Sequence, residues 1–372
     1  MQTSLQPRPA TPENRMPVGI QTLADELNLS IATVSRAMKD DAKIRYETRQ
    51  RVQEAARKLG YIPNHQARLL RAGKTRRLGL VLPSLINPVY SEKIATSQSI
   101  ARELGYELTF ACAERNPSQE DMQIRHLISL GVDGLIVMLS SQVKDESHAV
   151  HLALQRGIAV VLMGNAARVA PPGCSTLRVD SVTGRSRALE YLISLGHRHI
   201  GFIGLRQQYD RCFTQLPEDE TNVWLPVTRM LKQAGITAGQ CQYVSAAPGL
   251  ASSGYEAMVE RLKDTRPLPT AYLAVDDQVA IGAMTALQNH GLRVPHDISM
   301  VGADNTVTAK FAQPCLTTIS QTHLDLGKRA IEMVVRHIQT PDLPAEHTLL
   351  DTTLIVGLST ARAREHQLPA EL

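Results

Sequence analysis

Apolar residues near the start of the chain recur at the three-four spacing of amphipathic helices. The first such set is Ile20, Leu23, Ala24 and Leu27. A tight turn at Asn28 follows, and Ser30 is a favourable N-cap for a second helix over residues 31–38. The residues expected where the two helices of a helix-turn-helix cross are Ala24, Leu29 and Val34.

A third amphipathic helix is predicted over residues 46–59, and Gly60 is a suitable residue to end it. Its apolar stripe consists of Val52, Ala55, Ala56 and Leu59. Residues 1–16, rich in Pro, Thr, Gln and Asn, are typical of a disordered lead-in. The pattern therefore predicts a small all-α module at the start of the chain.

From Leu78 onward, short apolar strands alternate with helical stretches. The predicted strands cover residues 77–83, 106–113, 134–139, 159–164, 175–180, 199–205, 242–247, 271–275, 298–304 and 353–358. Strands repeated roughly every 25–30 residues with helices between them indicate parallel sheets of the doubly wound type. Ten strands exceed one comfortable sheet, so two α/β lobes are expected.

The net charge of +4 hides an uneven distribution. Residues 17–77 contain 13 Lys or Arg and 6 Asp or Glu, whereas residues 78–372 contain 25 basic and 29 acidic residues. A basic module on a slightly acidic body is the electrostatic footprint of a nucleic-acid-binding protein. On charge alone, a chance excess of surface Lys and Arg is the alternative.

The second predicted helix carries side chains suited to reading DNA, because a helix in the major groove presents its first turn to base edges. Ile31 and Ala32 can touch a thymine methyl, and Arg36 is long enough to reach guanine O6 and N7. The side chains expected to hold phosphates are Ser30, Thr33, Ser35, Lys39 and Arg45. The alternative is a plain three-helix bundle with a capping serine and a surface arginine.

A basic segment, NHQARLLRAGKT, follows Pro63. A helix of one or two turns is marginal in water, because nucleation costs more than a few backbone bonds return. Leu70 lies among cations and needs an apolar partner, and a base step of the minor groove can accept such a wedge. The alternative is an ordinary linker whose leucines pack on the body.

Several long motifs occur in a fixed order: ADELNLSIATVSRAMKD, ETRQRVQEAARKLGYIPNHQARLLRAGKTRRLGLVLP, LGHRHIGFIG, VDDQVAIGAMTALQNHGLRVPHDISMVGADN and PCLTTISQ. In sequence and spacing they resemble the LacI/GalR family of bacterial transcriptional repressors. The resemblance implies a homodimer whose helices at residues 30–38 read two half-sites of palindromic double-stranded DNA. It also implies hinge helices, about residues 64–71, that form on the DNA and insert Leu70 into the minor groove. The other hinge residues expected at the minor groove are Asn64, Ala67 and Arg68.

The resemblance further implies an N-terminal all-α helix-turn-helix module and an α/β two-lobed effector domain with parallel sheets, like the type I periplasmic binding proteins. The expected domains are a helix-turn-helix DNA-binding domain at 17–63, a hinge helix and linker at 64–77, and an effector-binding and dimerisation domain at 78–372. The expected crossings between lobes are near Gly196-His197, Pro314 and Pro341–Pro344. They give a first lobe of 78–195 with 315–342 and a second lobe of 197–313 with 343–372.

Two residues of the module depart from the family pattern. Arg45 stands where a capping Ser or Thr usually begins the third helix, and loss of a cap costs ~1 kcal/mol. A phosphate contact by Arg45 would recover part of this loss. Gly19 stands where a Thr is common before the first helix. Neither change disables the fold, but both are expected to loosen the free module.

Candidate effector-binding residues follow predicted strands, where such folds bind ligands. Asp277 is expected to pair with ligand hydroxyls, as the resemblance implies, while the adjacent Asp276 replaces a usual Asn. Two adjacent carboxylates favour an amine or, alternatively, cap the next helix. Asn87 and Tyr90 follow the first strand, and Tyr90 is expected either to stack on a sugar face or to be a core tyrosine.

The effector-binding arginine of many family members is missing. Its position falls at Val223, and the Gly-Phe pair that follows it becomes Pro226-Val227. Arg206 or Arg211 is a candidate replacement, and Trp224 a candidate for lining the cleft. The effector is therefore expected to differ from an ordinary free sugar, or the regulator to respond to something else.

Signatures of enzymes, metal sites and membrane proteins are lacking. The Gly73-Lys74-Thr75 sequence lacks the first glycine of a phosphate-binding loop, where Arg68 stands, and no GxGxxG follows a strand. His197 and His199 have no acidic or Cys partners at metal-ligand spacing. The five cysteines form no CxxC pair, and neither a secretory signal nor a spanning helix is predicted. We expect no catalysis, no cofactor, no metal and a cytoplasmic protein, associated with the nucleoid when bound.

The sequence thus predicts a DNA-binding transcriptional regulator, specifically a repressor of a catabolic operon released by a sugar-like small molecule. Corepression, in which the ligand promotes DNA binding, uses the same parts and stays open. A solute-binding protein is a third hypothesis, but it would need a signal peptide and no basic module.

Overall fold

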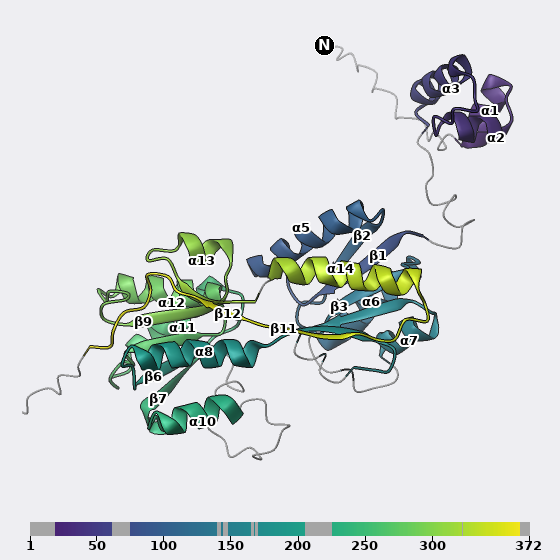
Figure 1. The fold of residues 1–372 in the computed structure, drawn as a ribbon. Coiled ribbons are helices and arrows are strands. Elements are labelled where there is room, and N and C mark those ends of the chain that lie inside the picture. Colours follow the sequence, from purple (N-terminus) through teal and green to yellow (C-terminus); the bar gives the residue numbers. More distant parts are fainter. Residues whose placement is uncertain are drawn as a thin grey trace, which may run out of the picture. The chain divides into compact units, whose positions relative to one another are not determined.

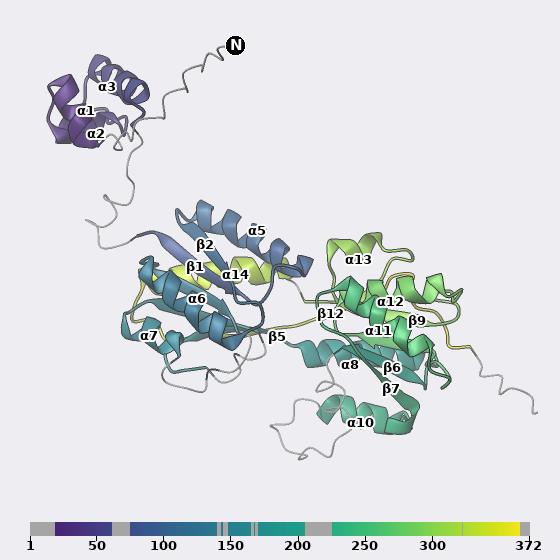
Figure 2. The ribbon, with the colours of Figure 1, turned by 180° about the vertical axis from the view of Figure 1, so that it is seen from behind.

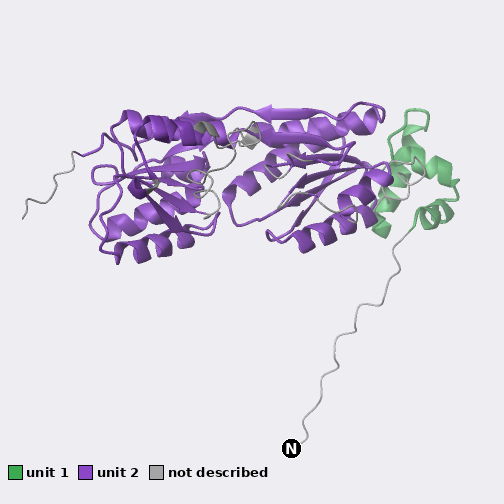
Figure 3. Ribbon diagram, turned by 90° about the horizontal axis from the view of Figure 1, so that it is seen from below, with its two compact units in different colours: residues 1–75 green, residues 76–372 purple. Residues whose placement is uncertain are grey.

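The computed structural model describes residues 19–61, 75–139, 143, 148–164, 167, 170–204, 225–321 and 323–364. The chain divides into two compact units, residues 1–75 and 76–372, which Figure 3 colours separately. The division falls within the linker that the sequence predicts between the helical module and the α/β body.

The first unit is a three-helix bundle of α1 (Ile20–Leu27), α2 (Ile31–Ala37) and α3 (Tyr46–Leu59). The helices lie where the apolar spacing predicts them. Leu23, Val34 and Val52 are fully buried at their junction. Gly60 ends α3 with a left-handed φ of 66°, as expected of a residue without a Cβ. Leu59 departs from the prediction: it is 36% exposed, because Tyr61 packs on this core after the turn instead.

The second unit contains two lobes, each built on a six-stranded sheet (Figures 1 and 2). The first-lobe sheet has the order β11-β5-β4-β3-β1-β2, with all paired strands parallel. Its strands are β1 (Arg77–Leu82), β2 (Glu107–Cys112), β3 (Gly134–Met138), β4 (Ala159–Met163), β5 (Ser175–Val179) and β11 (His347–Leu350). One face is covered by α5 (Pro88–Glu103) and α14 (His323–Gln339), the other by α6 (Pro117–Ser129) and α7 (Ala149–Gln155).

The second-lobe sheet has the order β12-β10-β9-β8-β6-β7, parallel except for the β10–β12 pair. Its strands are β6 (Ile200–Gly204), β7 (Cys241–Ser245), β8 (Ala271–Ala274), β9 (Ser299–Asp304), β10 (Thr317–Ser320) and β12 (Thr353–Ile355). One face is covered by α8 (Ser181–Ser194) and α10 (Leu225–Gln233), the other by α11 (Ala251–Leu262) and α12 (Asp277–Asn289). The short helices are η2 (Ala238–Gln240) and α13 (Val307–Phe311).

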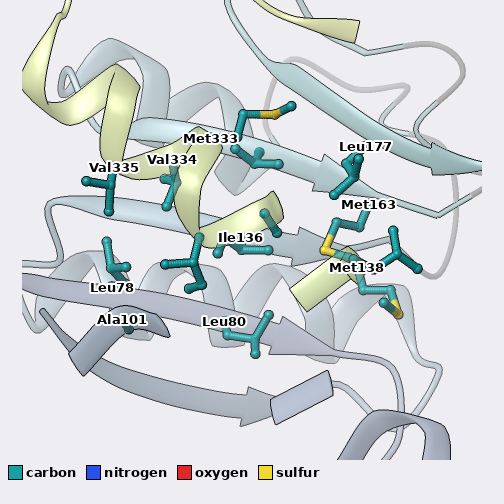
Figure 4. Close-up of a cluster of buried hydrophobic side chains, with 14 of the residues drawn as sticks. Leu78, Leu80, Ala101, Ile136, Met138, Met163, Leu177, Met333, Val334 and Val335 are labelled. Carbon is teal, nitrogen blue, oxygen red and sulfur yellow. The ribbon is translucent and has the colours of Figure 1, made fainter. Parts of the chain in front are cut away.

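The first-lobe core shows why these strands read as nearly unbroken apolar runs. Leu78 and Leu80 of β1 belong to one core cluster with Val334 and Val335 of α14 and Ala101 of α5 (Figure 4). Val81, the residue after Leu80, belongs to the cluster on the opposite face of the sheet. Helices cover both faces of the sheet, so the side chains that point to either face are buried.

All ten predicted strands are present, with small differences at their ends. β10 and β11 were not predicted, because TTIS and HTLL are short and partly polar. They become strands by pairing with β9 and β5, which lie elsewhere in the sequence.

The predicted crossing points between lobes are wrong. The predictions were Gly196-His197, Pro314 and Pro341–Pro344. Helix α8 packs in the second lobe, so the first crossing precedes Ser181; β10 joins the second-lobe sheet, so the second crossing follows Ser320. β11 joins the first-lobe sheet, so the third crossing lies between Leu350 and Thr353. Glycine and proline mark turns, but the lobe that an element joins depends on partners distant in sequence.

Candidate DNA-binding surface and inter-lobe site

Helix α2 begins at a well-formed cap. Ser30 Oγ accepts a hydrogen bond from the Thr33 backbone N–H at 3.1 Å and lies 2.8 Å from Thr33 Oγ1. The capping role predicted for Ser30 is therefore confirmed. The same hydroxyl is the one predicted to hold a phosphate, so such a contact would involve a group that already stabilises the helix end.

The side chains predicted to read bases lie on the exposed side of α2. Val34 and Ala37 are fully buried in the bundle, whereas Ile31 is 43% exposed and Ala32 and Arg36 are also exposed. Positions 32 and 36 are one helical turn apart and share a face. This face offers apolar groups and a guanidinium together, a combination that suits major-groove base edges.

The predicted phosphate-binding residues differ in exposure. Lys39 and Arg45 are exposed, and Thr33 and Ser35 are half-buried. Arg45 occupies the N-cap of α3 with extended backbone angles (φ −56°, ψ 141°) and makes no capping hydrogen bond. The missing cap predicted from the sequence is therefore confirmed.

Arg49, which sequence reasoning missed, ties together the turn between α2 and α3. Its Nε lies 2.9 Å from Asp40 Oδ1, and its Nη1 donates to the carbonyl oxygens of Asp41 and Ile44, both at 3.2 Å. Its guanidinium lies 5.8 Å from the centroid of the exposed Tyr46 ring. In the sequence, the adjacent Asp40-Asp41 pair was the feature that indicated a basic partner for this turn.

Several candidates lie outside the described residues. They are the hinge residues Asn64, Ala67, Arg68 and Leu70, the residues Arg206, Arg211 and Trp224, and the lead-in at 1–16.

The two lobes meet at the carboxyl ends of their strands. Asn87 follows β1 and caps α5, its Oδ1 accepting from Val89 N at 3.0 Å. Its Nδ2 donates across the lobes to Asp304 Oδ2 at 3.3 Å, and Gln321 Nε2 donates to Asp304 Oδ1 at 2.7 Å. Asp304 ends β9 with a φ of 111°, rare outside glycine, as is common at functional sites. We define the inter-lobe site as Asn87, Tyr90, Lys93, Arg115, Asp276, Asp304 and Gln321.

Asp276 caps α12, as the simpler of the two interpretations predicts. Its Oδ1 accepts from Val279 N at 3.0 Å, and its Oδ2 accepts from Gly249 N at 2.6 Å. A Cβ on Gly249 would lie 3.1 Å from Asn87 Cβ, so this glycine lets the second lobe approach the first closely. Asp276 therefore helps to shape the inter-lobe site with its carboxylate already bonded.

Asp277 is fully buried. Its Oδ1 accepts from Thr318 Oγ1 at 2.5 Å, and its Oδ2 accepts from the Thr306 N–H at 2.8 Å and Thr306 Oγ1 at 2.9 Å. Strand β10, unpredicted from the sequence, brings Thr318 against this carboxylate. The pairing of Asp277 with ligand hydroxyls stays a prediction.

The three neighbouring carboxyls resist ionisation. Burial raises the pKa of Asp277 to about 7, although the Thr318 and Thr306 bonds oppose the shift. Burial also raises the pKa of Asp304 well above its usual range, and repulsion from the other two carboxylates adds to this effect. Burial raises the pKa of Asp276 as well. The second-lobe wall therefore carries less negative charge than three aspartates suggest.

The first-lobe wall carries cations. Lys93 Nζ lies 5.5 Å from the centroid of the Tyr90 ring. Burial raises the pKa of the Tyr90 hydroxyl, while the interacting Arg115 guanidinium opposes the shift. Tyr90 packs on the core of the first lobe, as the core interpretation predicts. That it stacks on a sugar face stays a prediction.

Sequence reasoning missed Lys93, Arg115, Asp304 and Gln321. The clearest overlooked signal was on α5, whose buried positions recur every four residues. They are Val89, Lys93, Ser97 and Ala101. A lysine on a buried stripe marks a site, because an ammonium is rarely placed there without a purpose.

Two further findings concern the described residues. No helix among them has the length and apolar character needed to cross a membrane. Their His, Cys, Asp and Glu side chains form no group that could hold a metal ion.

Comparisons with protein families match both units. Residues 20–64 match the family described as bacterial regulatory proteins, lacI family. Residues 189–360 match a periplasmic binding protein-like domain. The predicted combination of a helix-turn-helix module and a two-lobed effector domain is thereby confirmed.

Curated relatives match over nearly their whole length. The transcriptional repressor CytR of Escherichia coli (strain K12) is 30% identical over 343 residues, covering 92% of this chain and 96% of the relative. Catabolite control protein A of Priestia megaterium is 30% identical over 329 residues, covering 87% and 93%. The solved lac repressor bound to ONPG in its repressed state is 27% identical, with a TM-score of 0.70, and the match covers 93% of this chain and 100% of that one.

Proposed function

The chain belongs to the lacI family of bacterial regulatory proteins and is a DNA-binding transcriptional regulator, not an enzyme; we propose that it represses a catabolic operon until a sugar-like effector releases it. It would act in the bacterial cytoplasm as a homodimer on palindromic double-stranded DNA. The exposed face of α2 carries this proposal.

Ile31 and Ala32 would contact thymine methyl groups, and Arg36 would donate two hydrogen bonds to one guanine in each half-site. The residues proposed to hold phosphates are Ser30, Thr33, Ser35, Lys39 and Arg45. The hinge residues proposed for the minor groove are Asn64, Ala67, Arg68 and Leu70. These contacts combine base readout with positioning on the backbone.

The effector would bind between the lobes. Asn87 and Asp304 are bonded across this junction, so a ligand that exchanges that bond for its own contacts would change the relative energies of lobe arrangements. Asp277 would support the site through Thr306, and Trp224 is proposed to line it. That the lac repressor was solved with bound ONPG favours a sugar-like ligand.

The homodimer would use apolar groups of the second lobe. Val307, Phe311 and Leu358 are 51%, 79% and 68% exposed, and Phe311 and Leu358 line one surface pocket. Figures 1 and 2 both place α13 on the same side of the unit as α5, and Val307 N donates to Glu92 Oε1 of α5 at 3.2 Å. A surface spanning both lobes would let the dimer sense their arrangement.

The test is selection of binding sites for the full chain from random DNA duplexes, followed by footprinting with and without small molecules. We expect a protected inverted repeat, and Arg36→Ala should relax base preference by ~1–3 kcal/mol at one position per half-site. Arg57→Ala, which removes the same charge from α3, is the matched control and should leave base preference intact. No protected inverted repeat under any condition refutes the proposal. Protection that appears only with ligand identifies corepression instead of release.

A further inference from the structure

Lys93 is a buried cation whose hydrogen-bonding capacity is unused. Its side chain belongs to a residue only 7% exposed, on the buried stripe of α5. An ammonium has three N–H donors, yet within the described parts of the chain none of them has a hydrogen-bond acceptor. Its contact is with the face of the Tyr90 ring. Lys93 Nζ is not one of the fully buried polar atoms without a partner among the described residues, so an incoming acceptor can reach its N–H groups.

The position of Lys93 directs it to the inter-lobe site. Burial lowers its pKa, and the carboxylates of Asp304 and Glu92 oppose that shift. Asp304 belongs to the opposite lobe and is already bonded to the amides of Asn87 and Gln321. In its ionised form it attracts the ammonium across the junction, without an ion pair within 4 Å. An incoming group could occupy the open donors of Lys93.

A second cation approaches the same tyrosine. Arg115 interacts with the Tyr90 hydroxyl, while Lys93 lies over the ring. A Cβ on Gly249 would lie 3.6 Å from Arg115 Nη2, so the guanidinium also reaches the second lobe. Two cations from one lobe thus flank one aromatic ring at the inter-lobe site.

The opposing carboxyl groups are each held by hydrogen bonds from the protein. Each oxygen of Asp276 accepts from a backbone N–H, and both oxygens of Asp277 accept from threonines of their own lobe. Each oxygen of Asp304 accepts from a side-chain amide. Within the described residues, the Lys93 N–H groups are donors at this site that an effector could occupy. An oxyanion would accept from them through charge-assisted hydrogen bonds, which are stronger than those to a neutral hydroxyl.

We propose that Lys93 and Arg115 bind an oxyanion of the effector, a carboxylate or a phosphate, so that the effector is an acidic sugar derivative. This inference rests on the proposed function, which places a small molecule between the lobes. The effector-binding arginine of the family would fall at Val223, between the second-lobe strands β6 and β7 in the sequence. Lys93 and Arg115 come from the first lobe instead.

The test is isothermal titration calorimetry on the full chain with matched pairs: glucose and glucuronate, galactose and galacturonate, ribose and ribose 5-phosphate, fructose and fructose 6-phosphate. We expect at least one acid to bind tenfold or more tightly than its neutral partner. The carboxylate and phosphate arms identify the group. Lys93→Met should lower affinity for that acid by 10- to 100-fold and leave the melting temperature unchanged or raised, because it removes the cost of taking an ammonium out of water.

The conservative Lys93→Arg variant should retain the preference for the acid. Three results overturn the inference: neutral partners that bind as tightly as the acids, no binding of any acid at 10 mM, or Lys93→Met binding the acid as well as the wild type. Footprinting on the same preparation separates the two proposals. If the inverted repeat is protected and a neutral sugar releases it, this inference alone fails; if no inverted repeat is protected, the proposed function fails.

Discussion

Arg45→Ser should stabilise the DNA-binding unit, because it supplies the cap that α3 lacks. The chain contains its own template: Ser30 caps α2 at φ −69° and ψ 147°, close to the φ −56° and ψ 141° of Arg45. At these angles Ser30 Oγ reaches the N–H three residues on, and a serine at 45 should reach the Thr48 N–H in the same way. No backbone movement is required.

The expected gain is ~1 kcal/mol from the capping bond. For a unit of about sixty residues, this corresponds to a rise of about 8 °C in melting temperature. It also slows hydrogen exchange about fivefold for those α3 amides that exchange only when the whole unit unfolds. Removing a cation from the positive end of the helix dipole adds to this gain.

The assay is hydrogen exchange of α3 peptides in the full chain, with Arg45→Ala as the matched control. Both variants lose the same charge, but only serine can cap, so their difference isolates the hydrogen bond. Equal protection of α3 in the two variants would show that the cap reasoning is wrong. If Arg45 also holds a phosphate, both variants should reduce the salt slope of DNA binding by about one, equally.

Two further predictions concern the second unit. Since burial raises the pKa of Asp277 to about 7, the uncharged carboxyl is favoured in the fold, and its stabilising contribution is complete below about pH 4 and lost as pH rises through 7. Chemical denaturation from pH 4 to 8 should therefore show the wild type losing a few kcal/mol more than Asp277→Asn; parallel pH profiles would contradict this. Phe311→Lys should convert the dimer to monomer in sedimentation and weaken operator binding, whereas Leu349→Lys, an exposed leucine on β11, is the control. A dimer that persists at micromolar Phe311→Lys would exclude this surface.

The sequence by itself determined the elements that depend on near neighbours. The cap at Ser30, the end of α3 at Gly60 and all ten predicted strands follow from spacing and side-chain type within a few residues. The exposed face of α2 is equally local, since Val34 and Ala37 fix which side of the helix is buried. These features could be predicted because a helix or strand is periodic and its ends have distinct hydrogen-bonding needs.

Only the tertiary structure decided which elements share a lobe and which side chains meet. β11 joins the first-lobe sheet by pairing with β5, and nothing local in HTLL specifies that partner. Asn87 and Asp304 are 217 residues apart and meet because Asn87, at the start of α5, and Asp304, at the end of β9, lie in facing lobes. The same packing buries Lys93 opposite Asp304 and encloses Asp277 among threonines. Burial and charge balance are properties of assembled surfaces, so the chemistry of the inter-lobe site emerges only when distant segments come together.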